Sequence, residues 1–281
     1  MPDVSWNPEG NHYIWFGNNL DLLPLIPNGA ITVAYLDPPF NTGRVQSRTT
    51  SSATSSSTGA RSGFGGRKYD LTLEKLLSYD DSFADYWSFL FPRLEEVWRT
   101  LSDRGTLYLH LDWREVHYAK VALDMIFGRE NFVNEIIWAY DYGGKTKKRW
   151  PTKHDTILVY VKNPAAYVFN SDDIDREPYM APGLVGEEKA ARGKLPTDVW
   201  WHTIVSPTGK EKTGYATQKP LGILTRIIRA SSRPGDWVLD PFAGSGTTGH
   251  AAGELGRKFV VMDSNPEALD IMGQRLAPYL S

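Results

Sequence analysis

The chain has 281 residues, of which 23% are charged and 41% hydrophobic, with a formal charge of −2 and no cysteine. This length suits one large domain or two smaller ones, and the lack of cysteine excludes disulfide bonds, thiolate catalysis and cysteine-ligated zinc. No apolar run approaches the roughly 20 residues that span a membrane, and residues 1–10 lack the features of a signal peptide. We therefore expect a cytoplasmic protein without a membrane partner.

Hydrophobic periodicity predicts strands that alternate with helices along most of the chain. In chain order, we predict a strand over 13–16, a helical turn closed by Pro27, a strand over 30–37, a helix over 83–101, a strand over 105–111, a helix over 114–128, strands over 134–140 and 155–161, a helix over 219–232, a strand over 236–240, a helix over 246–256, a strand over 258–263 and a helix over 265–280. This alternation favours an α/β fold with a mostly parallel, twisted sheet and helices on both faces.

Two segments interrupt this alternation. Residues 44–68 are rich in Ser, Thr and Gly, which predicts a mobile loop. Residues 162–215 are irregular and rich in Pro and Gly. We therefore divide the chain into a main domain, 1–133 with 216–281, and an inserted region, 134–215.

Basic residues gather in two places on this nearly neutral chain. Residues 44–69 contain Arg44, Arg48, Arg61, Arg67 and Lys68 without an acid, and residues 145–153 contain Lys145, Lys147, Lys148, Arg149 and Lys153. Local basic clusters are typical of a surface that meets a polyanion, although solvated loops give the same pattern. His110 and Asp112 lack a convincing third ligand, so we interpret them as strand-end residues and predict no metal site.

The stretch "YLDPPFNTG", residues 35–43, follows a predicted buried strand. Its prolines end the strand and stiffen the chain that follows. At such a strand end, the Asp37 carboxylate and the Pro38 carbonyl can accept hydrogen bonds from one exocyclic amine, and the Phe40 ring can stack on the attached heterocycle. Two acceptors would localise the lone pair of the nitrogen, which could then attack a methyl sulfonium.

A second motif, "VLDPFAGSGTTGHAAGELGRKFVVMD", reads as strand, Gly-rich turn, helix and strand. Gly244, Gly246 and Gly249 match G-x-G-x-x-G, and Asp263 lies 19 residues after Gly244. This geometry suits an adenosine, with the acid on the ribose hydroxyls. The motif alone does not separate a nicotinamide oxidoreductase from an S-adenosylmethionine enzyme. Its late position favours the second, because the other strands come earlier in the chain.

Four segments together resemble the amino-group DNA methyltransferases, over nearly the whole chain. "YLDPPFNTG" resembles their catalytic Asp/Asn/Ser-Pro-Pro-aromatic motif, "LDPFAGSGTT" their S-adenosylmethionine motif, "GYATQKPLGILTRII" the segment before it, and "GNNLDLL" their Gly-Asp-Asn-Leu segment, with Asn18 where Asp is commoner. With the catalytic motif first, the order is that of the permuted β group. The resemblance implies a Rossmann-like, circularly permuted methyltransferase fold with an inserted target-recognition region over 134–215.

The resemblance also implies roles for individual residues. Catalysis would fall to Asp37, Pro38, Pro39 and Phe40. The cofactor S-adenosylmethionine would meet Asn18, Thr217, Lys219, Asp240, Phe242, Gly244, Ser245, Gly246, Thr247 and Asp263. Of these, Thr217 and Lys219 would close over its methionine end. Double-stranded DNA would meet Arg44, Lys145, Lys147, Lys148, Arg149, Trp150 and Lys153, with Trp150 as a stacking or wedge residue beside a flipped base.

Several alternatives remain open at this point. Methylation at ring carbon 5 of cytosine needs a thiolate that the chain lacks, so the amines of adenine and cytosine remain. Asp in the first motif position favours adenine N6, with cytosine N4 as the alternative. RNA or a glutamine amide as substrate, a nicotinamide oxidoreductase and a catalytically dead DNA-binding subunit are further readings. A homodimer and a separately acting restriction endonuclease are partners that the resemblance suggests.

Overall fold

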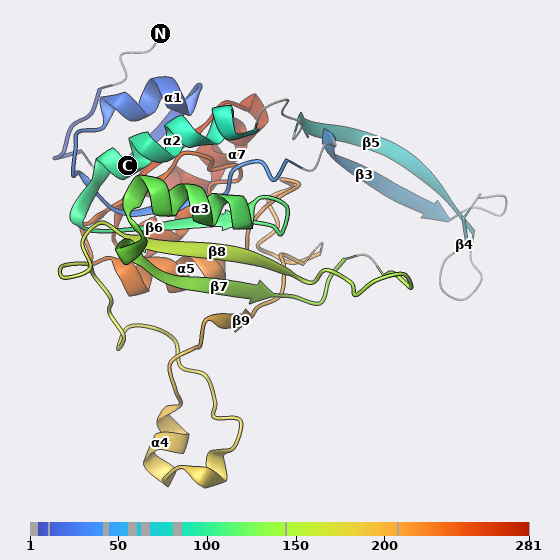
Figure 1. Ribbon diagram of the computed structural model, residues 1–281. Coiled ribbons are helices and arrows are strands. Elements are labelled where there is room, and N and C mark those ends of the chain that lie inside the picture. The colour runs from blue at the N-terminus through green and yellow to red at the C-terminus, as the bar shows by residue number, and fades with distance from the viewer. Residues whose placement is uncertain are drawn as a thin grey trace.

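The computed structural model describes residues 5–10, 12–41, 45–55, 61–62, 68–80, 86–143, 145–206 and 208–280. An eight-stranded sheet lies at the centre of the molecule (Figure 1). In spatial order its strands are β1 (His12–Phe16), β11 (Lys258–Asp263), β10 (Trp237–Asp240), β2 (Ile31–Leu36), β6 (Leu101–Leu111), β8 (His154–Val161), β7 (Phe132–Ala139) and β9 (Val199–Trp201). The first five are parallel, β8 is antiparallel to β6 and β7, and β9 is parallel to β7. The predicted mostly parallel sheet is confirmed.

Helices cover both faces of this sheet (Figure 1). They are α1 (Asn19–Leu22), α2 (Tyr86–Thr100), α3 (Val116–Phe127), α5 (Leu221–Ser231), α6 (Thr247–Glu254) and α7 (Pro266–Leu276), with the short 3-10 helices η1 (Leu23–Leu25), η3 (Arg129–Asn131) and η5 (Ala277–Tyr279). A further 3-10 helix, η4 (Pro182–Leu184), lies beside α4 (Glu187–Arg192). Side chains of α2 and α3 pack in one core cluster, and those of α5, α6 and α7 in a second. Strand β2 contributes to both, since Leu36 lies in the first and Tyr35 in the second. Burial on both faces explains its largely apolar sequence.

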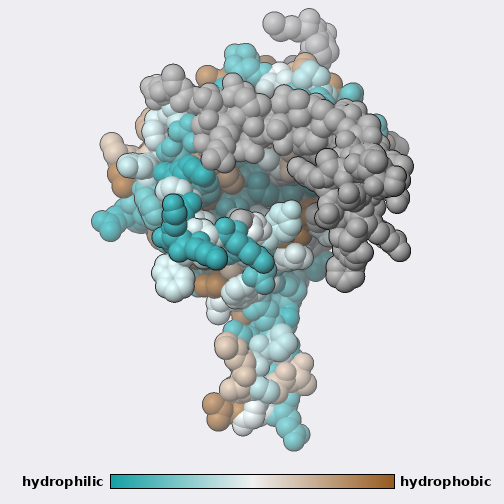
Figure 2. Space-filling model, turned by 90° about the vertical axis from the view of Figure 1, so that its right-hand side faces the viewer, coloured by the Kyte–Doolittle hydropathy of each residue, from teal (hydrophilic) through white to brown (hydrophobic). Residues whose placement is uncertain are grey.

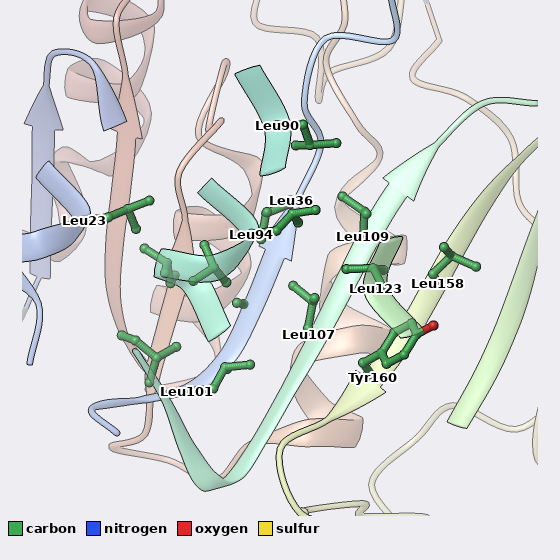
Figure 3. Packing of buried hydrophobic residues seen from close by; sticks show 14 of the residues in the cluster. Leu23, Leu36, Leu90, Leu94, Leu101, Leu107, Leu109, Leu123, Leu158 and Tyr160 are labelled. Atoms are coloured by element: carbon green, nitrogen blue, oxygen red, sulfur yellow. The ribbon is translucent and has the colours of Figure 1, made fainter. Parts of the chain in front are cut away.

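Helix α2 buries one apolar face against the sheet. Its buried residues Tyr86, Leu90, Leu94 and Val97 recur at spacings of three and four, as an amphipathic helix requires. Leu90 and Leu94 point toward the strand residues of the same core, among them Leu107 (Figure 3). The helix thereby fixes β2 and β6 from one side.

Replacing Leu94 with Ala is expected to lower the free energy of unfolding by about 2 to 5 kcal/mol, because the fully buried side chain leaves a cavity in a close-packed core. Urea denaturation followed by circular dichroism measures the change. The matched control is Leu184→Ala, since the Leu184 side chain is exposed and its loss should change stability by less than about 0.5 kcal/mol. Equal effects of both replacements would contradict this packing.

The segment predicted as a mobile loop over 44–68 is in part a strand. Residues of β3 (Val45–Ser55) pair antiparallel with β5 (Lys68–Asp80), and β4 (Arg61–Ser62) pairs with the first two residues of β5 along its other edge. The loop prediction was therefore wrong for 45–55. The Thr residues of this segment suit a strand as well as a loop, since β-branched side chains favour extended backbone.

The inserted region predicted over 134–215 does not begin at a structural boundary. Strands β7 and β8 continue the central sheet through β6, so residues 134–139 and 154–161 belong to the main body. Two parts extend from it in Figure 1: the connection between β7 and β8, and the segment with helix α4 (Glu187–Arg192). The role of this region in target recognition stays a prediction.

Candidate active site

A cleft of about 430 Å³ lies at the carboxyl ends of β1, β11, β10 and β2. Parallel strands place their carboxyl ends at one edge of the sheet, which is where open α/β sheets bind ligands. The residues predicted to bind the cofactor that line it are Asn18, Thr217, Lys219, Asp240, Phe242, Gly244, Ser245, Thr247 and Asp263. Gly246 does not line the cleft, and of the predicted catalytic residues Asp37 and Pro39 line it whereas Pro38 and Phe40 do not.

The Gly-rich turn between β10 and α6 forms the floor of this cleft. Gly244 adopts a φ of 50°, and a Cβ there would lie 2.8 Å from Cε1 of the Tyr215 ring. Only glycine fits without displacing that ring. The Gly244 N–H donates to Oδ2 of Asp263 at 2.8 Å, while Oδ1 accepts from the Asn265 N–H at 2.8 Å. The turn therefore positions the acid that was predicted for the ribose.

Asp240 is buried beneath the same turn. One carboxylate oxygen accepts from the Phe242 N–H at 2.9 Å, and the other accepts from the Thr248 hydroxyl at 2.5 Å. Burial raises the pKa of Asp240 to about 7, against the lowering effect of both hydrogen bonds. Its charge therefore changes near neutral pH.

At the β1 side of the cleft, a buried arginine organises the turn that contains Asn18. Arg93 of α2 donates to the side-chain oxygens of Asn18, at 2.8 Å, and Asn19, at 2.6 Å. Asn19 in turn donates to the carbonyl of Pro241 at 2.7 Å, which ties this turn to the Gly-rich turn. Arg93 and Asn19 also line the cleft. Sequence reasoning missed both, because their partners are more than 70 residues away in the chain.

At the β2 end, Asp37 lies among charged and aromatic groups. Its Oδ2 accepts a hydrogen bond from the Lys219 ammonium, which also lies 5.1 Å from the centre of the Phe40 ring. Its Oδ1 is buried and has no hydrogen-bond partner among the described residues. The His110 ring meets the Phe40 ring edge-on, with centroids 5.4 Å apart. The site thus offers one buried, unsatisfied carboxylate oxygen beside an aromatic ring and an adenosine-sized cleft.

Comparison with known proteins identifies the family of this chain. A protein-family model described as DNA methylase, labelled for N6 and N4 enzymes, matches residues 31–274. The chain belongs to this DNA methylase family. It is also 31% identical over 260 residues to the type II methyltransferase M.HpaI of Haemophilus parainfluenzae. The alignment covers 92% of this chain and 72% of that protein. The DNA adenine methyltransferase YhdJ of Escherichia coli strain K12 is 30% identical over 273 residues, covering 92% and 81%.

Solved structures share the fold of this DNA methylase. The complex of M1.HpyAVI with S-adenosylmethionine has a TM-score of 0.59 at 21% identity and covers 94% of this chain and 98% of that one. The cytosine-N4-specific PvuII DNA methyltransferase has a TM-score of 0.64 at 17% identity and covers 95% and 86%. The predicted fold class and enzyme class are confirmed, and S-adenosylmethionine is the methyl donor of the family. The β-group assignment and the permutation stay predictions.

The second basic cluster of this DNA methylase lies on the same edge of the sheet as the cleft. Strand β7 is parallel to β6 and β2, because both β7 and β6 are antiparallel to β8. The connection after β7, residues 140–153, therefore leaves from the edge where Asp37 lies. We call residues 145–153 the basic loop. Figure 2 shows hydrophilic residues gathered on this face beside a hollow.

The predicted DNA-binding residues of the basic loop are mostly exposed. Lys145, Lys147, Lys148, Arg149 and Trp150 are all exposed, Trp150 to 93%, whereas Lys153 is half-buried and donates to the carbonyls of Asp141 and Gly143. Arg44 lies outside the described residues. Trp201, at the end of β9, is exposed on the same edge, whereas Trp200 packs in the core. The described residues contain no cluster of three metal-ligating acids and histidines, and none of their helices has the length and apolar character that a bilayer crossing requires.

Proposed function

We propose that this protein transfers the methyl group of S-adenosylmethionine to N6, the exocyclic amine nitrogen of adenine, in double-stranded DNA. The observation that carries the proposal is the half-buried Asp37 carboxylate at the end of the cleft, whose buried Oδ1 lacks a hydrogen-bond partner among the described residues. A buried acceptor without a donor is costly unless a ligand supplies one. An exocyclic NH2 is a donor of the required kind.

The cleft fits the methyl donor. Gly244 lets the backbone approach a ligand, and Asp263 is held where ribose hydroxyls would lie. When bound, S-adenosylmethionine supplies a methyl group on a positively charged sulfur. The chain's own residues would then orient the amine through Asp37 and the Pro38 carbonyl, hold the base against Phe40, and keep the cofactor between Asn18 and Lys219.

Support for DNA as the substrate comes from the family and from the basic loop. Exposed Lys147, Lys148 and Arg149 suit contacts with phosphates, and Trp150 suits stacking or wedging beside a flipped base. Adenine is preferred because Asp stands at position 37 and because YhdJ is named an adenine enzyme. Cytosine N4 is the second candidate, since the PvuII enzyme is named for it. We also propose a cognate restriction endonuclease that acts separately, because several relatives are named type II methyltransferases. A homodimer is proposed on the family resemblance alone.

Mass spectrometry of nucleosides tests the proposal. Unmodified plasmid DNA of mixed sequence is incubated with the protein and S-adenosylmethionine and then digested. We expect N6-methyladenine. N4-methylcytosine instead would keep the mechanism and overturn the choice of base. DNA of several unrelated sequences without either product would contradict the proposed function.

The affinity for S-adenosylmethionine is expected to rise about 3- to 10-fold between pH 6 and pH 8. Asp240 has a pKa raised to about 7, so it gains its negative charge over this range and then attracts the sulfonium across the cleft. Isothermal titration calorimetry measures the affinity. S-adenosylhomocysteine, whose sulfur is uncharged, is the control ligand and should show a weaker dependence. In Asp240→Asn the dependence should disappear, and its persistence there would assign it to another group.

A further inference from the structure

His110 is a buried histidine next to Asp37 that the proposed mechanism has not used. It lies at the carboxyl end of β6, one residue beyond Leu109, which pairs with Leu36 of β2. Its side chain is fully buried. The Nδ1 atom is 2.8 Å from the Tyr35 hydroxyl oxygen and 3.5 Å from Oδ1 of Asp37. The imidazole therefore faces the one carboxylate oxygen of Asp37 that lacks a hydrogen bond.

Asp155 of β8 lies on the other side of the imidazole. Its Oδ2 is 3.3 Å from Nε2 of His110, and its Oδ1 accepts a hydrogen bond from the Tyr140 hydroxyl at 3.1 Å. Burial raises the pKa of Asp155, but the contact with His110, together with the Lys219 ammonium and the Tyr140 hydroxyl, outweighs this effect and the net shift is downward. Asp155 is thus ionised at neutral pH and accepts the Nε2–H of His110. This fixes Nδ1 as the nitrogen that faces Asp37.

Two carboxylates and one ammonium lie around His110. Lys219 contributes one positive charge, and Asp37 and Asp155 contribute two negative charges, so these three groups carry a net charge of −1, which an imidazolium would balance. The remaining neighbours do not change this sum. Tyr35 and Tyr140 have raised pKa values and stay neutral, chiefly because of burial, Asp112 is paired with Arg114, and the rings of Phe40 and Trp138 are uncharged.

We propose that His110, backed by Asp155, takes up through Asp37 the proton that the exocyclic amine loses during methyl transfer. This inference rests on the proposed function. The N–C bond forms as the C–S bond breaks, with the bonding pair left on sulfur. The N–H bond then breaks, and its proton passes to Oδ1 of Asp37 and on to Nδ1 of His110, where the Asp155 carboxylate balances the imidazolium. The other carboxylate oxygen of Asp37, Oδ2, accepts a hydrogen bond from the Lys219 ammonium. His110 acts through Asp37, so it is a positioning residue that does not touch the base.

The test is the pH profile of single-turnover methylation, with excess protein and saturating S-adenosylmethionine, for wild type, His110→Asn and Asp155→Asn. Loss of a proton acceptor typically costs about 10² to 10⁴-fold, and we expect both variants to be slowed about 10²-fold at pH 7. Without the acceptor the proton must leave to water or hydroxide. The ratio of variant rate to wild-type rate should therefore rise at least 10-fold between pH 7 and pH 9. Asp240 is present in the wild type and in both variants, so dividing the variant rate by the wild-type rate cancels the effect of its titration.

Tyr160→Phe is the matched control. It alters a buried residue of the same strand, β8, and removes a hydrogen bond to Asp124 on the other side of the sheet. It should keep the wild-type rate and profile. Thermal melting checks each fold, and Asp155→Asn decides the question if His110→Asn does not fold. If the variants are slowed by the same factor at every pH, or are not slowed, this inference is overturned while the proposed function stands. A wild-type protein that methylates no DNA would overturn the proposed function and this inference with it.

Discussion

Replacing Asp37 with Ala is expected to lower the rate of methyl transfer by about 10³-fold or more, while the affinity for S-adenosylmethionine changes by less than about threefold. The carboxylate supplies the acceptor without a hydrogen-bond partner at the end of the cleft, and interactions that orient the reacting amine contribute mainly to the transition state. Asp240 and Asp263 are held at the Gly-rich turn by hydrogen bonds that do not involve Asp37, so the cofactor side of the cleft should persist. Single-turnover incorporation of labelled methyl groups and isothermal titration calorimetry give the two quantities.

Two companion variants make this result specific. Asp37→Asn retains one carbonyl acceptor and should keep more activity than Asp37→Ala. Asp172→Ala removes a largely exposed carboxylate that pairs with Arg176, so it should leave both quantities unchanged. Simultaneous loss of methyl transfer and of cofactor binding in Asp37→Ala would assign Asp37 a structural role instead.

Replacing Lys147, Lys148 and Arg149 together with Ala is expected to weaken DNA binding about 10²-fold at low salt. Each basic side chain that neutralises a phosphate releases a counterion, and this release adds about 0.9 to the salt slope. The slope of log affinity against log salt concentration should therefore become shallower by about 2 to 3. Fluorescence anisotropy of a labelled duplex, titrated at several salt concentrations, measures both effects.

The opposite edge of the sheet provides the control with the same change of charge. Arg104, Arg233 and Lys258 lie near the amino-terminal ends of β6, β10 and β11, away from the cleft. Replacing these three with Ala should leave the salt slope as in the wild type. If both triple variants lose the same affinity, net charge and not the basic loop governs DNA binding. An unchanged slope in the basic-loop variant would place the DNA elsewhere.

The parts of the fold that the sequence predicts well are those with strong local patterns. Apolar runs predict β2 and β10 because both strands are buried on both faces, and the periodicity of Tyr86, Leu90 and Leu94 predicts α2. The cleft was predictable because Asp37, Asp240 and Asp263 each stand at or just after a strand end, where parallel strands bring them together.

Contacts between distant segments were not predictable in the same way. His110 meets Asp155 only because β8 returns antiparallel beside β6, and a sequence pattern gives no register for that pairing. The sequence signal that could have drawn attention to His110 was its place at the end of a predicted strand, since Asp37 occupies the matching position on β2. Arg93 was hidden for a similar reason: it lies on the helix face predicted to pack, yet it reaches Asn18 and Asn19 in the cleft.

The interleaved order of the sheet bears on how the chain folds during synthesis. Strand β2 lies between β6 and β10, and β1 pairs with β11, so the strands made first find neighbours among those made last. A nascent chain that has left the ribosome only as far as β9 presents β1 without a partner and β2 with one open edge, both of which invite wrong pairing. Asp37 meets Lys219 across 182 residues of sequence. Catalytic competence should therefore arise late, in one step with the insertion of β10 between β2 and β11.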